Sequence, residues 1–133
     1  MILLLDTDVL IDVALAREPH AEASGRLLDR LERRPGSAFV AWHSVSNFYY
    51  LVAPVRSGPA ATAFIEDLTG FVDVAPTSTA DLRFATRLAL PDFEDAMQVA
   101  AATACGAEAI ATRNVRDYRG SPIPARTPAD LLG

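Results

Sequence analysis

Carboxylates follow directly after short apolar stretches of this sequence. Asp6 ends the apolar run at residues 2–5, and Asp8 comes two residues later. Asn114 and Asp117 follow another apolar run near the end of the chain. Because an unpaired carboxylate is costly at the end of a buried strand, Asp6 is the first candidate for a functional side chain.

Further oxygen-bearing side chains lie at two expected helix starts. Asp92, Glu94 and Asp95 come soon after Pro91, and Asn47 lies in the first turn expected for an earlier helix. Hard divalent cations such as Mg²⁺ or Mn²⁺ take oxygen ligands of this kind. Two such ions about 4 Å apart can hold a phosphodiester, activate water and stabilise the leaving oxygen. If these segments converge, metal-assisted hydrolysis is the chemistry that they could perform.

Most of these acids also have an ordinary structural interpretation. Asp8 and Asp92 could each cap a helix, since Asp is a preferred N-cap residue. Asp95 could stabilise a first helical turn through the helix dipole, and we expect Glu94 to do no more than this. We expect Asp12 to be a solvated position on the first helix.

The elements that must position these residues alternate along the chain. Short apolar runs predict strands at residues 2–5, 38–41, 71–74 and 109–112, with a short fifth at Ile123. Caps, apolar periodicity and Pro or Gly breaks predict helices at residues 9–17, 20–34, about 44–56, 60–68, about 77–90 and 92–105, with a last turn from Thr127. This alternation predicts one α/β domain over residues 1–133 with a mainly parallel sheet, whose ligands bind beyond the carboxyl ends of the strands.

The composition narrows the class of protein. Half of the 133 residues are hydrophobic and the net charge is −5, while all twelve basic residues are arginine. An acidic chain binds nucleic acid poorly, because its negative charge repels the phosphates. Carboxylates that surround a bound cation add to the negative net charge, but the cation makes the local charge positive. Cys105 is alone and cannot form an internal disulfide, and no apolar stretch reaches the roughly 18 residues of a membrane span. We therefore expect a cytoplasmic protein without a membrane partner.

Three segments together resemble the PIN domain family. They are LLLDTDVLID at residues 3–12, PDFEDAMQ at residues 91–98 and IATRNVRDY at residues 110–118, followed by IPARTP at residues 123–128. The resemblance covers nearly the whole chain and implies a three-layer α/β/α sandwich with a mainly parallel sheet of four to five strands. It also implies a ribonuclease that depends on Mg²⁺ or Mn²⁺. Many small members are VapC-type toxins that act on RNA, pair with an antitoxin protein and form homodimers.

The resemblance assigns roles to particular positions. The first acid of the family falls on Asp6, and the acid of the late helix falls on Asp95, with Asp92 as its neighbour. The acid after the fourth strand falls on Asn114 or Asp117, and Asp117 is preferred because it keeps the charge. Asp6, Asp95 and Asp117 are therefore the predicted catalytic and metal-binding residues.

One position departs from the family pattern. The glutamate that the family usually carries in the third helix is replaced by Asn47, which can offer a carbonyl oxygen but no charge. Asp92, Asn47 and Asn114 remain candidate additional ligands. Arg113, Arg116 and Arg119 could contact backbone phosphates or simply lie in a solvated loop. The missing carboxylate leaves open a catalytically weak PIN-like module that binds RNA or a protein partner.

Two other classes of protein gather acids after a first strand. Residues 4–10 resemble the start of a haloacid dehalogenase-type phosphatase, in which the first Asp is a nucleophile. A response-regulator receiver also collects acids at a sheet edge. Both classes need a lysine, and this chain has none. Both are therefore disfavoured.

Overall fold

The strands form because short runs of Leu, Val, Ile and Ala are stable where a sheet is covered on both faces. The computed structural model describes residues 1–133. Its five-stranded sheet has the order β3-β2-β1-β4-β5, and every neighbouring pair is parallel. The strands are Leu3–Leu5 (β1), Ala38–Val40 (β2), Val72–Val74 (β3), Ala109–Ala111 (β4) and Ala125–Arg126 (β5). The expected fifth strand is present, two residues after Ile123.

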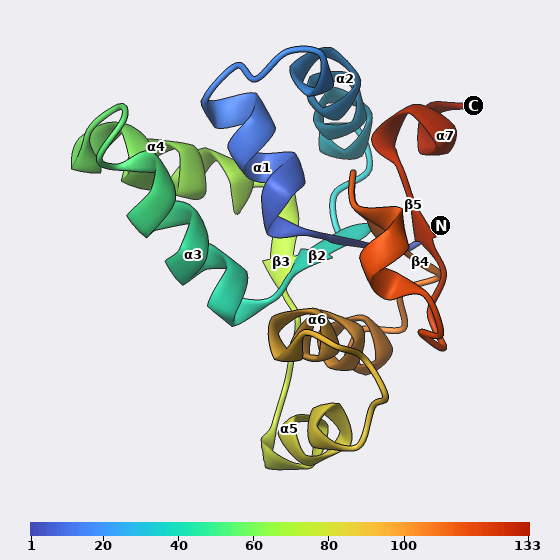
Figure 1. The fold of residues 1–133 in the computed structure, drawn as a ribbon. Coiled ribbons are helices and arrows are strands. Elements are labelled where there is room, and N and C mark those ends of the chain that lie inside the picture. Colours follow the sequence, from blue (N-terminus) through green and yellow to red (C-terminus); the bar gives the residue numbers. More distant parts are fainter.

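Helices connect and cover the strands (Figure 1). They are Thr7–Ala14 (α1), His20–Glu32 (α2), Trp42–Val52 (α3), Gly58–Leu68 (α4), Thr79–Thr86 (α5), Phe93–Ala104 (α6) and Pro128–Leu132 (α7), with a 3₁₀ helix at Val115–Tyr118 (η1). None of the helices has the length and apolar character that a bilayer crossing requires.

The sheet lies between two helical layers. Side chains alternate between the faces of a strand, so Leu3 and Leu5 pack into one core with α1, α2, α3 and α4. Leu4 packs on the opposite face with α6 and Tyr118, and α5 packs against α6. The predicted α/β/α fold with a parallel sheet is therefore confirmed (Figure 1).

Several helix boundaries differ from those expected. Helix α3 starts directly after β2, so Asn47 lies in its second turn rather than its first. Helix α5 ends at Thr86 instead of near Leu90. Helical backbone is unfavourable at Leu90 because Pro91 follows it. The η1 turn was not expected at all. It forms in the loop after β4, where the sequence predicted polar site residues but no regular secondary structure.

The starts of α1 and α6 matter most for the candidate site. Asp6, not Asp8, is the N-cap of α1, so the suggestion that Asp8 caps this helix was wrong. Asp92 does cap α6, and its side chain accepts a hydrogen bond from the backbone N–H of Asp95 at 3.1 Å. Both caps place acidic side chains at the carboxyl edge of the sheet.

Candidate active site

Asp6 lies where the central strand β1 ends, and three uncharged groups hold its carboxylate. Oδ1 accepts from the backbone N–H of Thr7 at 2.7 Å and from the side-chain amide of Gln98 at 3.1 Å. Oδ2 accepts from the hydroxyl of Tyr118 at 2.9 Å. The side chain is 8% exposed, and no basic group pairs with it. The carboxylate is therefore fixed in direction while its charge is left uncompensated.

Gln98 and Tyr118 are two residues of this site that the sequence did not single out. Gln98 is fully buried and also contacts the hydroxyl of Ser44 at 2.6 Å, while its Oε1 has no hydrogen-bond partner. Tyr118 is 4% exposed and closes η1. A signal for Gln98 was available, because it follows Asp95 by three positions and so lies on the same face of α6. Nothing comparable pointed to Tyr118, whose placement depends on η1.

Asp8 faces the loop after β4. Its Oδ2 accepts from the hydroxyl of Thr112 at 3.1 Å and from the side-chain amide of Asn114 at 2.9 Å. Burial, and next the charge of Asp6, raises the pKa of Asp8 to about 7. Asn114 thus acts as a donor to Asp8. Asp117 remains the acid that this segment brings to the site.

Asp12 is not the solvated helix position that we expected. It is fully buried, and its Oδ2 accepts from Nε of Arg113 at 2.8 Å in the one ion pair of the chain. Its Oδ1 has no partner. The sequence did not reveal this pairing because Arg113 lies about a hundred residues away, after the neighbouring strand β4.

The separated acidic segments meet around one cavity of about 520 Å³ at the carboxyl edge of the sheet. The polar residues that line it include Asp6, Asp8, Asn47, Glu94, Asp95, Arg113, Asn114 and Asp117. Asp92 lies outside this lining, in a hollow that it shares with Asp95, Asp117, Arg116 and Arg119. The convergence that the sequence predicted is therefore present, and the catalytic role of these residues stays a prediction.

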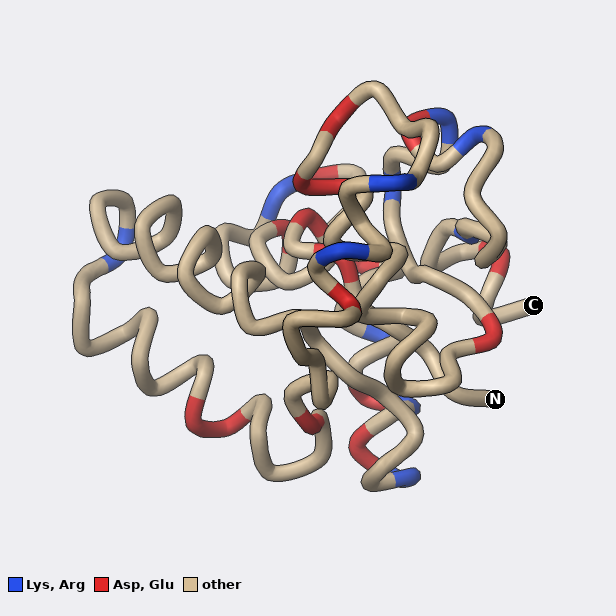
Figure 2. Tube along the Cα trace, turned by 90° about the horizontal axis from the view of Figure 1, so that it is seen from below, with Lys and Arg blue, Asp and Glu red and all other residues tan.

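The charges in this cavity act strongly on one another. Burial raises the pKa of Asp95 to about 6, and the charges of Asp92, Asp6 and Asp117 add to the rise, while the nearby Tyr118 hydroxyl opposes it. Acidic positions from several segments gather near the middle of the trace in Figure 2, with arginines around them. Such mutual repulsion is what a bound cation would relieve.

The donor set fits a hard divalent cation. The cavity offers carboxylate and amide oxygens, the ligands that Mg²⁺ and Mn²⁺ prefer. No three His, Cys, Asp or Glu side chains are already arranged to enclose an ion. Mg²⁺ commonly binds through one or two carboxylates and keeps several waters, so a complete protein cage is not required. Asp6, Asp8, Glu94, Asp95 and Asp117 are the acids that line this cavity.

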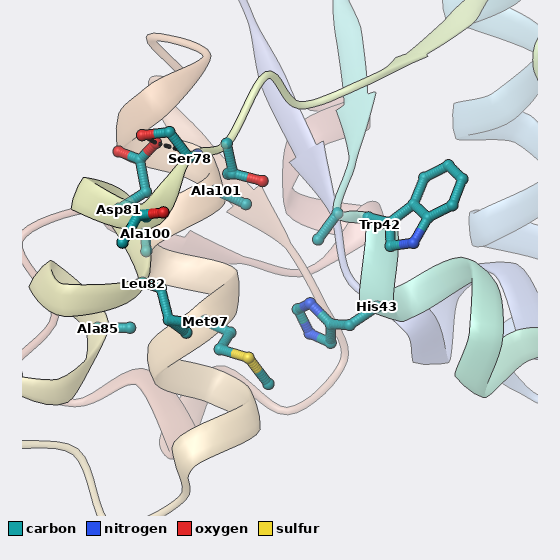
Figure 3. A pocket seen from close by; sticks show the side chains of 12 residues that line it. Trp42, His43, Ser78, Asp81, Leu82, Ala85, Met97, Ala100 and Ala101 are labelled. Atoms are coloured by element: carbon teal, nitrogen blue, oxygen red, sulfur yellow. Dashed lines mark hydrogen bonds between the residues drawn. The ribbon is translucent and has the colours of Figure 1, made fainter.

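A second cavity of about 300 Å³ lies between the start of α3 and helices α5 and α6 (Figure 3). Trp42, His43, Leu82 and Met97 line it, and most of its lining is hydrophobic. Burial lowers the pKa of His43, and the charge of Asp6 opposes this effect. The cavity offers one carboxylate, Asp81, and that group already caps α5. The acidic cavity is therefore the better candidate for chemistry.

Comparisons with known proteins agree with this geometry. A family model described as a PIN domain matches residues 3–116. No match was found among curated proteins.

Solved structures of the same fold include three bacterial proteins. VapBC2 from Rickettsia felis, bound to a DNA fragment from its promoter, superposes with a TM-score of 0.74 at 13% identity, over 96% of this chain and 98% of that chain. VapC20 from Mycobacterium tuberculosis, a sarcin-ricin loop cleaving toxin, gives 0.65 at 17% identity, over 81% and 86%. FitAcB from Neisseria gonorrhoeae gives 0.67 at 18% identity, over 96% and 99%. At these identities the likeness establishes a shared fold.

Proposed function

This chain belongs to the PIN domain family, and we propose that it is a ribonuclease that hydrolyses RNA phosphodiesters with the help of Mg²⁺ or Mn²⁺. One observation carries the proposal. Asp6, Asp95 and Asp117 come from three separate segments and line one cavity, while the one ion pair of the chain involves none of them. Carboxylates gathered without a basic partner favour a cation.

Asp6, Asp95 and Asp117 would hold the ion, with Asn47, Asn114 and Asp92 as further oxygen donors nearby. When bound, the ion would lower the pKa of a coordinated water and offset charge on the phosphate. Gln98 and Tyr118 donate to the two carboxylate oxygens of Asp6 and so fix the direction in which they point. Partners of this kind orient metal ligands and raise metal affinity.

Arg113 and Arg17 are the two arginines that line the acidic cavity, and Arg113 is the one that we propose binds the substrate phosphate. Asp12 engages its Nε, which leaves the other guanidinium N–H groups free to donate. Arg113 lines the acidic cavity, whereas Arg116 and Arg119 line the adjoining hollow. A guanidinium recognises phosphate through parallel hydrogen bonds. We therefore place Arg113 at the scissile phosphate and the other two arginines along the RNA backbone.

We further propose that the protein is the toxin of a toxin–antitoxin pair and acts in the cytoplasm as a homodimer. Its fold is shared with VapBC and FitAB proteins. Large apolar side chains on and just after α3, namely Trp42, Tyr50, Leu51 and Val55, are exposed. Exposed apolar patches mark protein interaction surfaces, and an antitoxin or a second copy would cover them.

A second function is favoured by one residue. Asn47 brings no charge to the cavity, so a catalytically weak module that binds RNA or a protein would keep this fold.

Cleavage assays separate the two functions. The purified chain, freed of any partner, is incubated with a mixed RNA pool and Mn²⁺, then with EDTA, then with Mn²⁺ restored. The nuclease proposal requires cleavage that EDTA stops and Mn²⁺ restores. Binding of RNA without cleavage at any metal concentration favours the weak module.

A further inference from the structure

Helices α3 and α6 each contribute a side chain to the acidic cavity, in which the carboxylate that the family pattern expects from α3 is missing. Helix α3 offers Asn47, and α6 offers Glu94, and the two line the same cavity as Asp6. Glu94 was expected from sequence to do no more than stabilise the helix start. In the folded chain, Glu94 instead brings a carboxylate to the same cavity as the neutral amide of Asn47.

The start of α6 explains why Glu94 faces this side. The Asp92 cap fixes the first turn, and successive helical residues point about 100° apart. Asp95 therefore lines both the acidic cavity and the adjoining hollow, whereas Glu94 lines the cavity alone. Glu94 also precedes Gln98 by four positions, so both lie on one face of α6.

Gln98 provides an independent sign that this face is built around Asp6. It is fully buried, its amide donates to Asp6 at 3.1 Å, and its Oε1 is left without a partner. A buried unpaired carbonyl oxygen is uncommon in folded proteins. The face that carries Gln98 to Asp6 carries Glu94 one turn earlier, where Glu94 lines the acidic cavity.

No basic side chain compensates Glu94. The one ion pair of the chain joins Arg113 to Asp12, so the Glu94 carboxylate lines the acidic cavity without an arginine partner.

We propose that Glu94 supplies from α6 the metal-binding carboxylate that Asn47 does not supply from α3. The inference rests on the proposed function and concerns the same divalent cation. The site thereby keeps the number of carboxylates expected for the family, with one of them supplied by α6 instead of α3.

Binding of Mn²⁺ tests the proposal without an activity assay. Free Mn²⁺ is measured by electron paramagnetic resonance for the wild type, for Glu94→Gln and for Glu94→Gln combined with Asn47→Glu. Glu66→Gln, on the exposed surface of α4, is the matched control. Circular dichroism of each metal-free variant verifies folding. We expect Glu94→Gln to weaken binding roughly tenfold or more, the double variant to recover most of that loss, and Glu66→Gln to match the wild type.

Four results would overturn the inference. Equal Mn²⁺ affinity in the wild type and Glu94→Gln removes Glu94 from the site and leaves the proposed function standing. A loss that the added Asn47→Glu does not recover shows that Glu94 does not replace an α3 carboxylate. Absence of Mn²⁺ binding by the folded wild type overturns the inference together with the metal-dependent function. Repeating the titration at about 1 M NaCl, where charges act over about 3 Å, must preserve the loss if Glu94 is a ligand.

Discussion

The hydroxyl of Tyr118 donates a hydrogen bond of 2.9 Å to Oδ2 of Asp6. The two residues lie 112 positions apart in the chain, and Tyr118 immediately follows Asp117. Burial, and next the charge of Asp6, raises the pKa of Tyr118, so the phenol stays a donor at every physiological pH. The bond ties the loop after β4 to the end of β1 and brings Asp117 to the same cavity as Asp6.

Substitution Tyr118→Phe removes this donor while keeping the ring in the core. We expect the free energy of unfolding to fall by about 1.5–3 kcal/mol, the value of a hydrogen bond to a charged group. The Mn²⁺ affinity should fall about tenfold, because Asp6 is then less well oriented. Chemical denaturation and Mn²⁺ titration measure the two effects. Tyr49→Phe, on α3 but outside the lining of the acidic cavity, is the control and should change neither value. Unchanged Mn²⁺ affinity in Tyr118→Phe would show that the bond supports the fold alone.

The pH dependence of stability follows from the raised pKa values of Asp8, about 7, and Asp95, about 6. Both carboxyls have unfolded-state pKa values of 3.8, so ionisation favours the unfolded chain. Their stabilising contribution is complete below about pH 4 and is lost as the pH rises to about 7. The metal-free protein should therefore melt at a lower temperature at pH 7.5 than at pH 5. Added Mn²⁺ should raise the melting temperature more at pH 7.5.

Thermal unfolding in EDTA and in Mn²⁺ at the two pH values checks this expectation. Asp8→Asn should flatten the metal-free pH dependence, since it removes the group with the higher pKa. A metal-free melting temperature that rises from pH 5 to pH 7.5, or an unchanged slope in Asp8→Asn, contradicts the electrostatic description of the site.

The ion pair between Arg113 and Asp12 should respond unequally to loss of its two partners. Asp12 is fully buried, whereas the side chain of Arg113 is 30% exposed. Arg113→Met leaves a buried unpaired carboxylate and should cost about 3 kcal/mol of unfolding free energy. Asp12→Asn leaves an arginine that water can reach and should cost less, about 1–2 kcal/mol. The double variant should cost less than the sum of the two single losses. Denaturant titration of the three variants measures this coupling, and strictly additive losses would show that the pair contributes nothing.

Much of the fold followed from local patterns in the sequence. The strands were predicted because short buried apolar runs between helices have few other stable arrangements, and Asp92 was correctly predicted as a cap. The helix starts were less certain, since Asp6 and Asp8 are both acceptable N-cap residues and only the tertiary position of β1 decides between them.

The site was predicted as a convergence of acids but not in its supporting contacts. Asp12 was misjudged because its partner lies on another strand, which no local pattern reveals. Gln98 and Tyr118 lie in the segments that carried the family resemblance, yet a buried amide and a phenol look like core residues until the acid that they contact is located. Glu94 was dismissed because a first-turn glutamate is common on any helix.

The choice between Asp117 and Asn114 can be settled directly. The side-chain amide of Asn114 is committed to Asp8 at 2.9 Å, whereas Asp117 keeps a free carboxylate in the cavity. Asp117→Asn should lower Mn²⁺ affinity about tenfold or more, and Asn114→Ala should lower it by less. Calorimetric titration with Mn²⁺ compares them. A larger loss in Asn114→Ala would transfer the ligand role to that residue.

The central claim is that Asp6 anchors a metal-dependent nuclease, and its most direct test is RNA cleavage in Mn²⁺ by the wild type and Asp6→Asn, both freed of any partner. Asn keeps the shape of the side chain and can still cap α1, so folding should survive. Asp67→Asn, on the exposed face of α4, is the control. We predict cleavage by the wild type and the control, with a rate roughly 100-fold or more lower in Asp6→Asn. Equal cleavage rates for the wild type and Asp6→Asn would contradict the account.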